Sequence, residues 1–236
     1  RDVAVTGVQT CALPILIIAI DGPAASGKST TARKVAQQLE FLYLDTGAMY
    51  RCVTLALLDQ HISISDVSAV NNLLESIDVN LSEDDGNPMV HLNKKNVTDK
   101  IRSAEVTSNV SAVSAIREVR KAMVRMQRKI ASNSNCVMEG RDIGTVVFPN
   151  AEVKIFLVAD ANVRAVRRQK DLLALGEMNS VDELVKEIEK RDAFDSTREH
   201  SPLQKAKDAF VIDTSHVTID EQVSEIIEIV NQKKRK

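Results

Sequence analysis

Gly22-Pro23-Ala24-Ala25-Ser26-Gly27-Lys28-Ser29 is the stretch that decides the fold of this 236-residue chain. It fits the pattern G-x-x-x-x-G-K-[ST], with an apolar run at residues 16–20 before it and an amphipathic stretch after it. Glycine allows successive backbone N–H groups to turn inward without Cβ clashes, and these groups form a concave anion site at a helix N-terminus. The motif therefore predicts an ATP-binding loop that consists of Gly22, Pro23, Ala24, Ala25, Ser26, Gly27, Lys28, Ser29 and Thr30.

Two side chains of this loop have chemistry that suits a triphosphate. The Lys28 ammonium is expected to reach the β- and γ-phosphates. The Ser29 hydroxyl is expected to ligate Mg²⁺, the cofactor that accompanies ATP. The alternative is a Gly/Ser-rich turn with a stray lysine, and the strand-like run before the motif argues against it.

Bulk composition is that of an ordinary globular protein. The net charge is −2, so no global basic field attracts nucleic acid or membrane. The three cysteines have no metal-binding spacing and are odd in number, which is typical of free thiols in a reducing compartment. No apolar run approaches the ~20 residues that span a bilayer. We therefore expect a cytoplasmic monomer without nucleic-acid or membrane partners.

The N-terminal segment does not share the pattern of the rest of the chain. Residues 5–15 resemble one reading frame of a common sequencing adapter, and the segment lacks the long apolar core of a signal peptide. Residues 1–15 are therefore expected to be a non-native or disordered leader. Residues 16–236 are expected to form a single domain.

Five apolar runs alternate with helical patterns along this domain. Strands are predicted at residues 16–20, 41–44, 136–138, 153–158 and 210–213, and the first two of these runs predict buried strands. Helices are predicted at residues 28–40, 51–58, 103–131, 162–175 and 180–191, with a last one after Thr218. This alternation predicts an α/β fold with a doubly wound, five-stranded parallel sheet. Ligands of such sheets lie beyond the carboxyl ends of the strands, where Asp21, Asp45 and Asp142 fall.

Two segments depart from this alternation. Residues 61–102 are predicted to be a small insertion with a helix at 71–77 and a hairpin of strands 78–82 and 89–93, because an Asp-Gly pair separates them. Residues 176–205 include a polar segment, 192–197, between two regular elements. We expect 176–205 to be a lid that closes over substrate and excludes water.

The loop alone does not choose between a kinase, a motor ATPase and a GTPase switch. The guanine-reading N-K-x-D of GTPases is absent from the sequence, and Asp160 suits a helix N-cap better than the acidic strand end of a motor ATPase. A small-molecule kinase must bring two phosphate-bearing substrates together, and guanidinium groups bind phosphate bidentately without losing charge. Candidate residues for this task are Arg51, Arg141, Arg191 and Arg198.

Five motifs make the chain resemble the bacterial cytidylate kinases over about residues 16–232. They are I-D-G-P…G-K-S-T (20–30), L-D-T-G-A-M-Y-R (44–51), E-G-R-D-I-G-T-V-V-F-P (139–149), K-I-F-L (154–157) and R-D-A-F-D with a later arginine (191–198). The resemblance implies a P-loop nucleoside monophosphate kinase with a monophosphate-binding insertion at 61–102 and a lid. It implies transfer of the γ-phosphoryl group of ATP to CMP or dCMP in pyrimidine metabolism, giving ADP and (d)CDP.

The resemblance also implies roles for individual residues. Thr46, Arg51, Arg141 and Arg198 would bind the acceptor phosphate; Ser111, Arg120 and Asp142 would surround cytosine; Arg191 and Asp195 would hold the ribose hydroxyls. Lys28, Arg141, Arg191 and Arg198 would stabilise the transferring group. Many relatives have Ser at position 46 and Gly at position 29. Other readings remain open: a kinase for UMP, AMP or a small metabolite, and a nucleotide-dependent switch or nucleic-acid-binding module.

Overall fold

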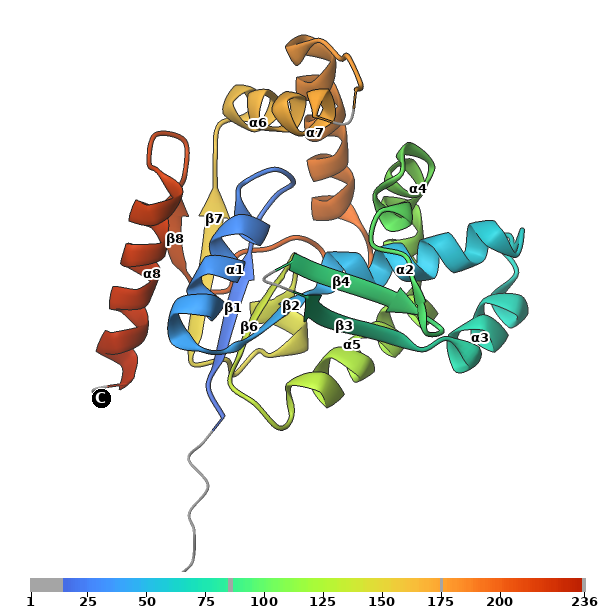
Figure 1. The fold of residues 1–236 in the computed structure, drawn as a ribbon, viewed down its shortest axis with the longest axis horizontal. Coiled ribbons are helices and arrows are strands. Elements are labelled where there is room, and N and C mark those ends of the chain that lie inside the picture. Colours follow the sequence, from blue (N-terminus) through green and yellow to red (C-terminus); the bar gives the residue numbers. More distant parts are fainter. Residues whose placement is uncertain (1–14, 85–86, 175, 235–236) are drawn as a thin grey trace, which may run out of the picture.

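Five parallel strands form the centre of the molecule (Figure 1). The structure, a computed structural model, describes residues 15–84, 87–174 and 176–234, so the predicted leader lies outside the described residues except for its last position. The strands are β1 (Ile17–Asp21), β2 (Leu42–Asp45), β6 (Cys136–Gly140), β7 (Val153–Val158) and β8 (Phe210–Asp213). Their spatial order is β2-β6-β1-β7-β8, which confirms the predicted parallel sheet.

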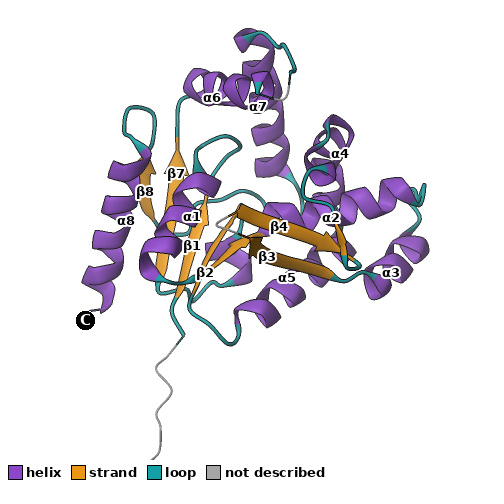
Figure 2. Cartoon of the chain, in the orientation of Figure 1, coloured by secondary structure: helices purple, strands orange, loops and turns teal. Residues whose placement is uncertain are grey.

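Helices cover both faces of the sheet (Figure 2). Side chains alternate along β1, so Ile18 and Ile20 join a core with α1 (Lys28–Leu39) and α8 (Ile219–Lys234). Ile17 and Ala19 join the larger core on the other face. That face is covered by α2 (Thr46–Asp59), α4 (Ala104–Ala115) and α5 (Arg117–Ala131). The prediction of a doubly wound sheet is therefore confirmed. The expectation that β2 is buried is wrong, because β2 is an edge strand and only Leu44 is fully buried in it.

The predicted long helix at 103–131 is wrong, because the chain breaks at Ile116. Ile116 has an extended backbone (φ −67°, ψ 126°) between α4 and α5. The apolar spacing continues through the break, since Val113, Ile116 and Val119 all contact the larger core. Periodicity therefore cannot reveal the change of direction.

The segment 61–102 contains a small antiparallel sheet, as predicted. Helix α3 (Val67–Ser76) precedes strands β3 (Val79–Asp84) and β4 (Asn87–Leu92), and the predicted Asp85–Gly86 turn between them lies outside the described residues. A third, short strand, β5 (Lys95–Asn96), and the 3₁₀ turn η1 (Lys100–Arg102) follow. The insertion stands beside the β2 edge of the main sheet (Figure 1).

Two packed helices, α6 (Ala161–Leu173) and α7 (Val181–Thr197), rise beyond the carboxyl ends of the strands (Figure 1). Asp160 caps α6, and Ser180 with Glu183 forms a capping box at the start of α7, as expected. Helix α7 ends six residues later than predicted, at Thr197. The expectation of a polar, non-regular segment at 192–197 is therefore wrong, because ion pairs to Asp192 and Asp195 stabilise these acidic positions inside the helix.

The carboxyl ends of the central strands lie in register. Asp21 pairs with Gly140 across β1 and β6, and Asp45 pairs with Glu139 across β2 and β6. Beyond β6 the chain forms a single π-helical turn, η2 (Ile143–Val147). Gly22 leaves β1 with φ +152°, and a Cβ there would lie 2.3 Å from the backbone oxygen of Leu157. The loop therefore needs glycine in order to pass β7.

A substitution tests this close approach. We expect Gly22→Ala to lower the free energy of unfolding by at least ~2 kcal/mol, because the clash is with backbone that cannot rotate away. Gly176→Ala is the control: Gly176 has φ +81° but open space around its Cβ position, so only the ~1 kcal/mol backbone cost is expected. Equal destabilisation of the two variants in urea titrations would contradict this account.

Candidate active site

The phosphate loop connects β1 to α1 at the carboxyl edge of the sheet. Gly27 ends the loop in a left-handed conformation (φ +90°), and no side chain of the described residues caps the helix after it. The first N–H groups of α1 therefore face the loop with the positive end of the helix dipole behind them. This geometry is that of an anion-binding site.

Lys28 folds back across the loop. Its Nζ donates to the carbonyl of Pro23 at 2.5 Å and to Oγ of Ser26 at 3.3 Å. Burial lowers the pKa of Lys28 well below its ordinary value, repulsion from Arg141 lowers it further, and attraction to Glu139 opposes the change. A bound anion would relieve both the desolvation and the repulsion, so the ammonium is poised for phosphate.

Glu139 links the phosphate loop to β2 and to the start of α2. Its Oε2 accepts a hydrogen bond from Ser29 Oγ at 2.9 Å, and its Oε1 accepts one from the Tyr43 hydroxyl. Its backbone carbonyl accepts a hydrogen bond from Thr46 Oγ1 at 2.6 Å. Burial is the main cause that raises the pKa of Glu139 to about 7, and Asp45 adds to the rise. Neither Glu139 nor Tyr43 had been predicted from the sequence to have a role.

Asp21 links the phosphate loop to the segment after β6. Its two carboxylate oxygens accept hydrogen bonds from the backbone N–H groups of Ile143 and Gly144, each at 2.8 Å. Burial raises the pKa of Asp21 to about 6, although these two hydrogen bonds lower it. The carboxylate thus positions η2, which directly follows Arg141 and Asp142.

Arginines crowd the space in front of this edge. Burial lowers the pKa values of Arg51 and Arg191 to about 10 each, and Arg141 and Arg168 repel both of them. The Nε atom of Arg191 is buried without a hydrogen-bond partner among the described residues. Side chains of one sign that repel each other in a buried place favour an anion between them. Arg168 had not been predicted from the sequence.

A second cluster lies deeper, between α4, α5 and α7. Arg120 and Asp142 form a buried ion pair, and Arg120 Nη1 also donates to the Ser114 carbonyl at 3.1 Å. Arg198 lies 3.9 Å from both Asp142 and Asp195. Asp195 in turn accepts from Arg141 Nε at 3.0 Å. The structure therefore joins five of the predicted residues in one continuous network: Arg120, Asp142, Arg198, Asp195 and Arg141.

Two predicted residues stand at the margin of this network. Ser111 is linked to it through its carbonyl, which accepts a hydrogen bond from Ser114 Oγ. The Arg51 guanidinium donates to the Ile101 carbonyl at 3.0 Å and to Thr107 Oγ1 at 2.8 Å, which orients it from the side of the insertion. Their ligand contacts stay predictions.

A family model for cytidylate kinases matches residues 18–232. This chain belongs to the cytidylate kinase family. Similar curated cytidylate kinases come from Halalkalibacterium halodurans (49% identity) and Carboxydothermus hydrogenoformans (50% identity), each over 216 residues that cover 92% of this chain and 97% of the relative. An uncharacterized protein from Eubacterium ventriosum ATCC 27560 shares the fold, with a TM-score of 0.53 at 14% identity over 93% of this chain and 99% of that one.

The kinase is thus a phosphotransferase with the P-loop kinase fold. Its helix pair α6–α7 contacts the phosphate loop through the ion pair of Arg164 and Asp192, which had not been predicted from the sequence. Arg164 donates to Asp192 and to the Ala24 carbonyl, and Asp192 accepts from the Ala24 N–H at 3.3 Å. The three partners are far apart in the sequence, and spacing gives no signal of them.

Oxygen ligands at the phosphate loop suit a magnesium ion that enters with ATP. Ser29 Oγ and Glu139 Oε2 lie 2.9 Å apart at the loop. Mg²⁺ is commonly held by one or two side-chain oxygens together with phosphate and water. Among the described residues no cluster of three or more His, Cys, Asp or Glu could enclose a metal. The residues present therefore fit a nucleotide-borne ion rather than a protein cage.

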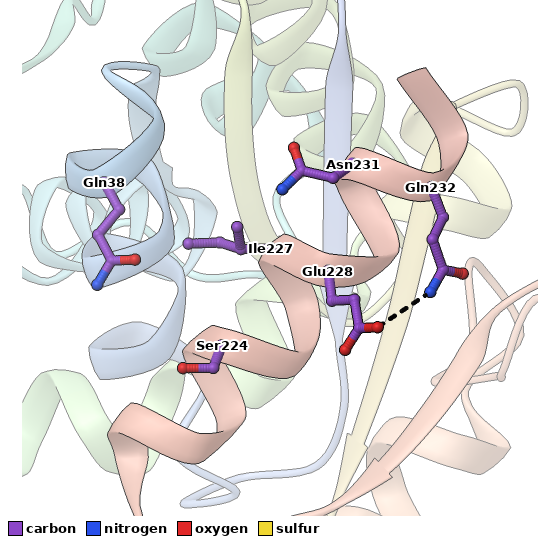
Figure 3. Close-up of a pocket in the computed structure, with 6 residues that line it drawn as sticks. All are labelled: Gln38, Ser224, Ile227, Glu228, Asn231 and Gln232. Carbon is purple, nitrogen blue, oxygen red and sulfur yellow. Dashed lines mark hydrogen bonds between the residues drawn. The ribbon is translucent and has the colours of Figure 1, made fainter. Parts of the chain in front are cut away.

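A surface hollow of the kinase lies between the C-terminal end of α1 and helix α8 (Figure 3). Its described lining is Gln38, Ser224, Ile227, Glu228, Asn231 and Gln232. The only ionisable group in that set is the carboxylate of Glu228, which would repel phosphate. Separately, no helix among the described residues is long and apolar enough to cross a membrane.

The raised pKa of Glu139 predicts a pH-dependent stability. Because folding raises this pKa from 4.5 to about 7, the folded state binds more protons between these values. The contribution of Glu139 to stability is therefore fully present below about pH 4.5 and is lost as the pH rises to about 7, by up to roughly 3 kcal/mol. In Glu139→Gln this change is absent, so the stability of the parent relative to the variant should fall across that range.

The control is Glu105→Gln, which changes an exposed glutamate in the first turn of α4. Its free energy of unfolding should follow the parent at every pH. Parallel curves for the parent and Glu139→Gln would show that the carboxyl is not buried in the folded protein.

Proposed function

We propose that this kinase transfers the γ-phosphoryl group of ATP to CMP or dCMP, in the cytoplasm and as part of pyrimidine nucleotide metabolism. The observation that carries the proposal is the convergence on Glu139, which accepts hydrogen bonds from Ser29 of the donor loop and from Thr46 on the acceptor side. One buried residue thereby sets the distance between two phosphate sites. Such a distance matters only for an enzyme that joins two phosphorylated ligands.

The chemistry requires alignment and charge more than proton transfer. The attacking oxygen of a nucleoside monophosphate is ionised near neutral pH, so no general base is needed. Lys28, Arg141, Arg191 and Arg198 neutralise charge on the transferring group, in a site that arginine repulsion has prepared for anions. When bound, Mg²⁺ would supply Lewis-acid charge at the β- and γ-phosphates, held by Ser29 and Glu139.

The acceptor, CMP or dCMP, binds across from the phosphate loop, at the network that joins Arg120, Asp142, Asp195 and Arg141. Thr46, Arg51 and Arg141 bind its phosphate, and Arg191 and Asp195 hold its ribose. The buried pair of Arg120 and Asp142 reads the base, with Ser111 nearby. The Asp142 carboxylate accepts from the 4-amino group of cytosine, and the Arg120 guanidinium donates to the acceptors of the ring.

We propose that the insertion and the lid move when the ligands bind. The insertion, residues 61–102, carries Ile101, which orients Arg51, and so closes on the monophosphate. The lid, residues 176–205, carries Arg191, Asp195 and Arg198 and closes over both ligands. The free, buried thiols of Cys52 and Cys136 suit a reducing cytoplasm, and we propose that the kinase acts as a monomer.

Replacing Asp142 tests base recognition. An Asp142→Asn amide can donate to the 4-carbonyl of uracil, whereas the parent carboxylate would face that carbonyl acceptor to acceptor, with no proton between them. An unmet buried polar group costs about 1–3 kcal/mol, so the ratio of kcat/KM for CMP over UMP should fall at least tenfold. Turnover is measured by ADP release with CMP, dCMP, UMP and AMP as acceptors.

The matched control is Asp220→Asn, which removes an exposed carboxylate at the start of α8. Its selectivity should equal that of the parent. If Asp142→Asn loses activity with CMP and UMP in equal proportion, Asp142 only supports the arginines. If the parent releases ADP no faster with any monophosphate than without one, the kinase proposal is wrong.

A further inference from the structure

Helices α6 and α7 together hold one residue of the phosphate loop from outside. Arg164 of α6 and Asp192 of α7 form an ion pair whose side chains are 8% and 19% exposed. Arg164 Nη1 also donates to the Ala24 carbonyl at 3.1 Å, and the Ala24 N–H donates to Asp192 Oδ1 at 3.3 Å. Both backbone polar groups of Ala24 are therefore bound by this one pair, and we call the arrangement the Ala24 clamp.

The next loop residue depends on the same two helices. Ala25 has a left-handed backbone (φ +56°), a conformation that costs an alanine roughly 1–2 kcal/mol. Its side chain packs against the apolar cluster between α6 and α7, which consists of Ala165, Leu172, Leu184 and Ile188. Contacts from outside the loop thus keep Ala25 in this conformation. The N–H groups that are expected to bind phosphate follow directly along the chain.

A further contact fixes the direction of the Arg164 side chain. Its Nε donates at 3.0 Å to the carbonyl of Ala159, which lies just before α6. The planar guanidinium thereby bridges the start of α6, the phosphate loop and α7 in fixed directions. A buried ion pair by itself adds little stability, because the loss of hydration offsets the attraction. The pair is therefore better explained by what it positions.

Helix α7 also reaches the acceptor network, one turn after the clamp. Asp195 follows Asp192 by three residues and accepts from Arg141 Nε at 3.0 Å. Arg191 lies next to Asp192 on the helix, and its buried Nε has no hydrogen-bond partner among the described residues. One helical turn therefore sets both the distance from the phosphate loop to the network and the direction of Arg191.

We propose that Arg164 and Asp192 are positioning residues that align α7 and Arg191 with the phosphate loop for phosphoryl transfer. Neither side chain needs to touch a ligand, because both act through Ala24 and through the helix. Without the clamp, the loop N–H groups and Arg191 would be in place for only part of the time, and fewer complexes would be aligned. The inference deepens the proposed function and rests on it for the identity of the acceptor.

The test is a double-mutant cycle with Asp192→Ala, Arg164→Met and the double variant. The controls are Glu189→Ala on α7 and Lys170→Met on α6, which change exposed side chains of the same charges. For each protein, kcat and the KM values for ATP and CMP are measured. ATP affinity is measured by calorimetry without an acceptor, and thermal unfolding is recorded.

Each single variant should lower kcat at least ~tenfold and weaken ATP binding severalfold, because alignment and loop geometry are both lost. The KM for CMP should stay within twofold of the parent, since the ion pairs of Asp142 and Asp195 with the arginines remain. The double variant should be no worse than the more impaired single variant, because both changes break one contact. The two controls should match the parent.

Three results would overturn the inference while leaving the proposed function intact. They are a kcat within twofold of an active parent in Asp192→Ala, multiplying effects of the two changes in the double variant, and an equal rise of both KM values with kcat unchanged. If a single variant does not fold, the double variant decides, because it leaves no buried charge unpaired. A parental kcat in that variant overturns the inference.

A parent that is inactive toward CMP would instead overturn the proposed function. The calorimetric affinity for ATP then still decides the role of the clamp, since it requires no acceptor. Unchanged ATP affinity in Asp192→Ala would overturn the inference in that case.

Discussion

Repulsion between buried cations is the constraint on which the site depends. Burial lowers the pKa values of Lys28, Arg51 and Arg191, and repulsion from Arg141 lowers all three further. Acidic residues from other elements neutralise only part of the charge, since Asp195 serves both Arg141 and Arg198. The excess positive charge is balanced when phosphate groups enter, so binding energy and the stabilisation of the transferring phosphoryl group have one source.

Buried carboxylates hold this charged site in shape at some cost to stability. Asp21 ties the phosphate loop to η2, and Glu139 ties Ser29 to Thr46. Burial raises the pKa of both acids, which means that their ionised forms are unfavourable in the folded protein. These groups lie at the carboxyl edge of the sheet and beside it, where function rather than stability decides the residue.

Local patterns predicted the sheet, the phosphate loop and the arginines, because strand hydrophobicity and the glycine motif are properties of neighbouring residues. The break at Ile116 escaped prediction, since the apolar period runs through it, and so did the full length of α7, which depends on the ion pairs of Asp192 and Asp195. Glu139 was quoted as part of a motif, but its partners Ser29 and Tyr43 are 110 and 96 residues away. Contacts between residues so far apart in the chain produce no regular spacing that a sequence pattern could reveal.

We propose that one charged site holds two nucleotides with their phosphates facing each other. The most direct test is calorimetric binding of a compound that joins adenosine and cytidine through a chain of five phosphates. We expect this compound to bind at least a hundredfold more tightly than ATP or CMP alone, and more tightly than its uridine counterpart. Affinity no greater than that of ATP would contradict a shared site.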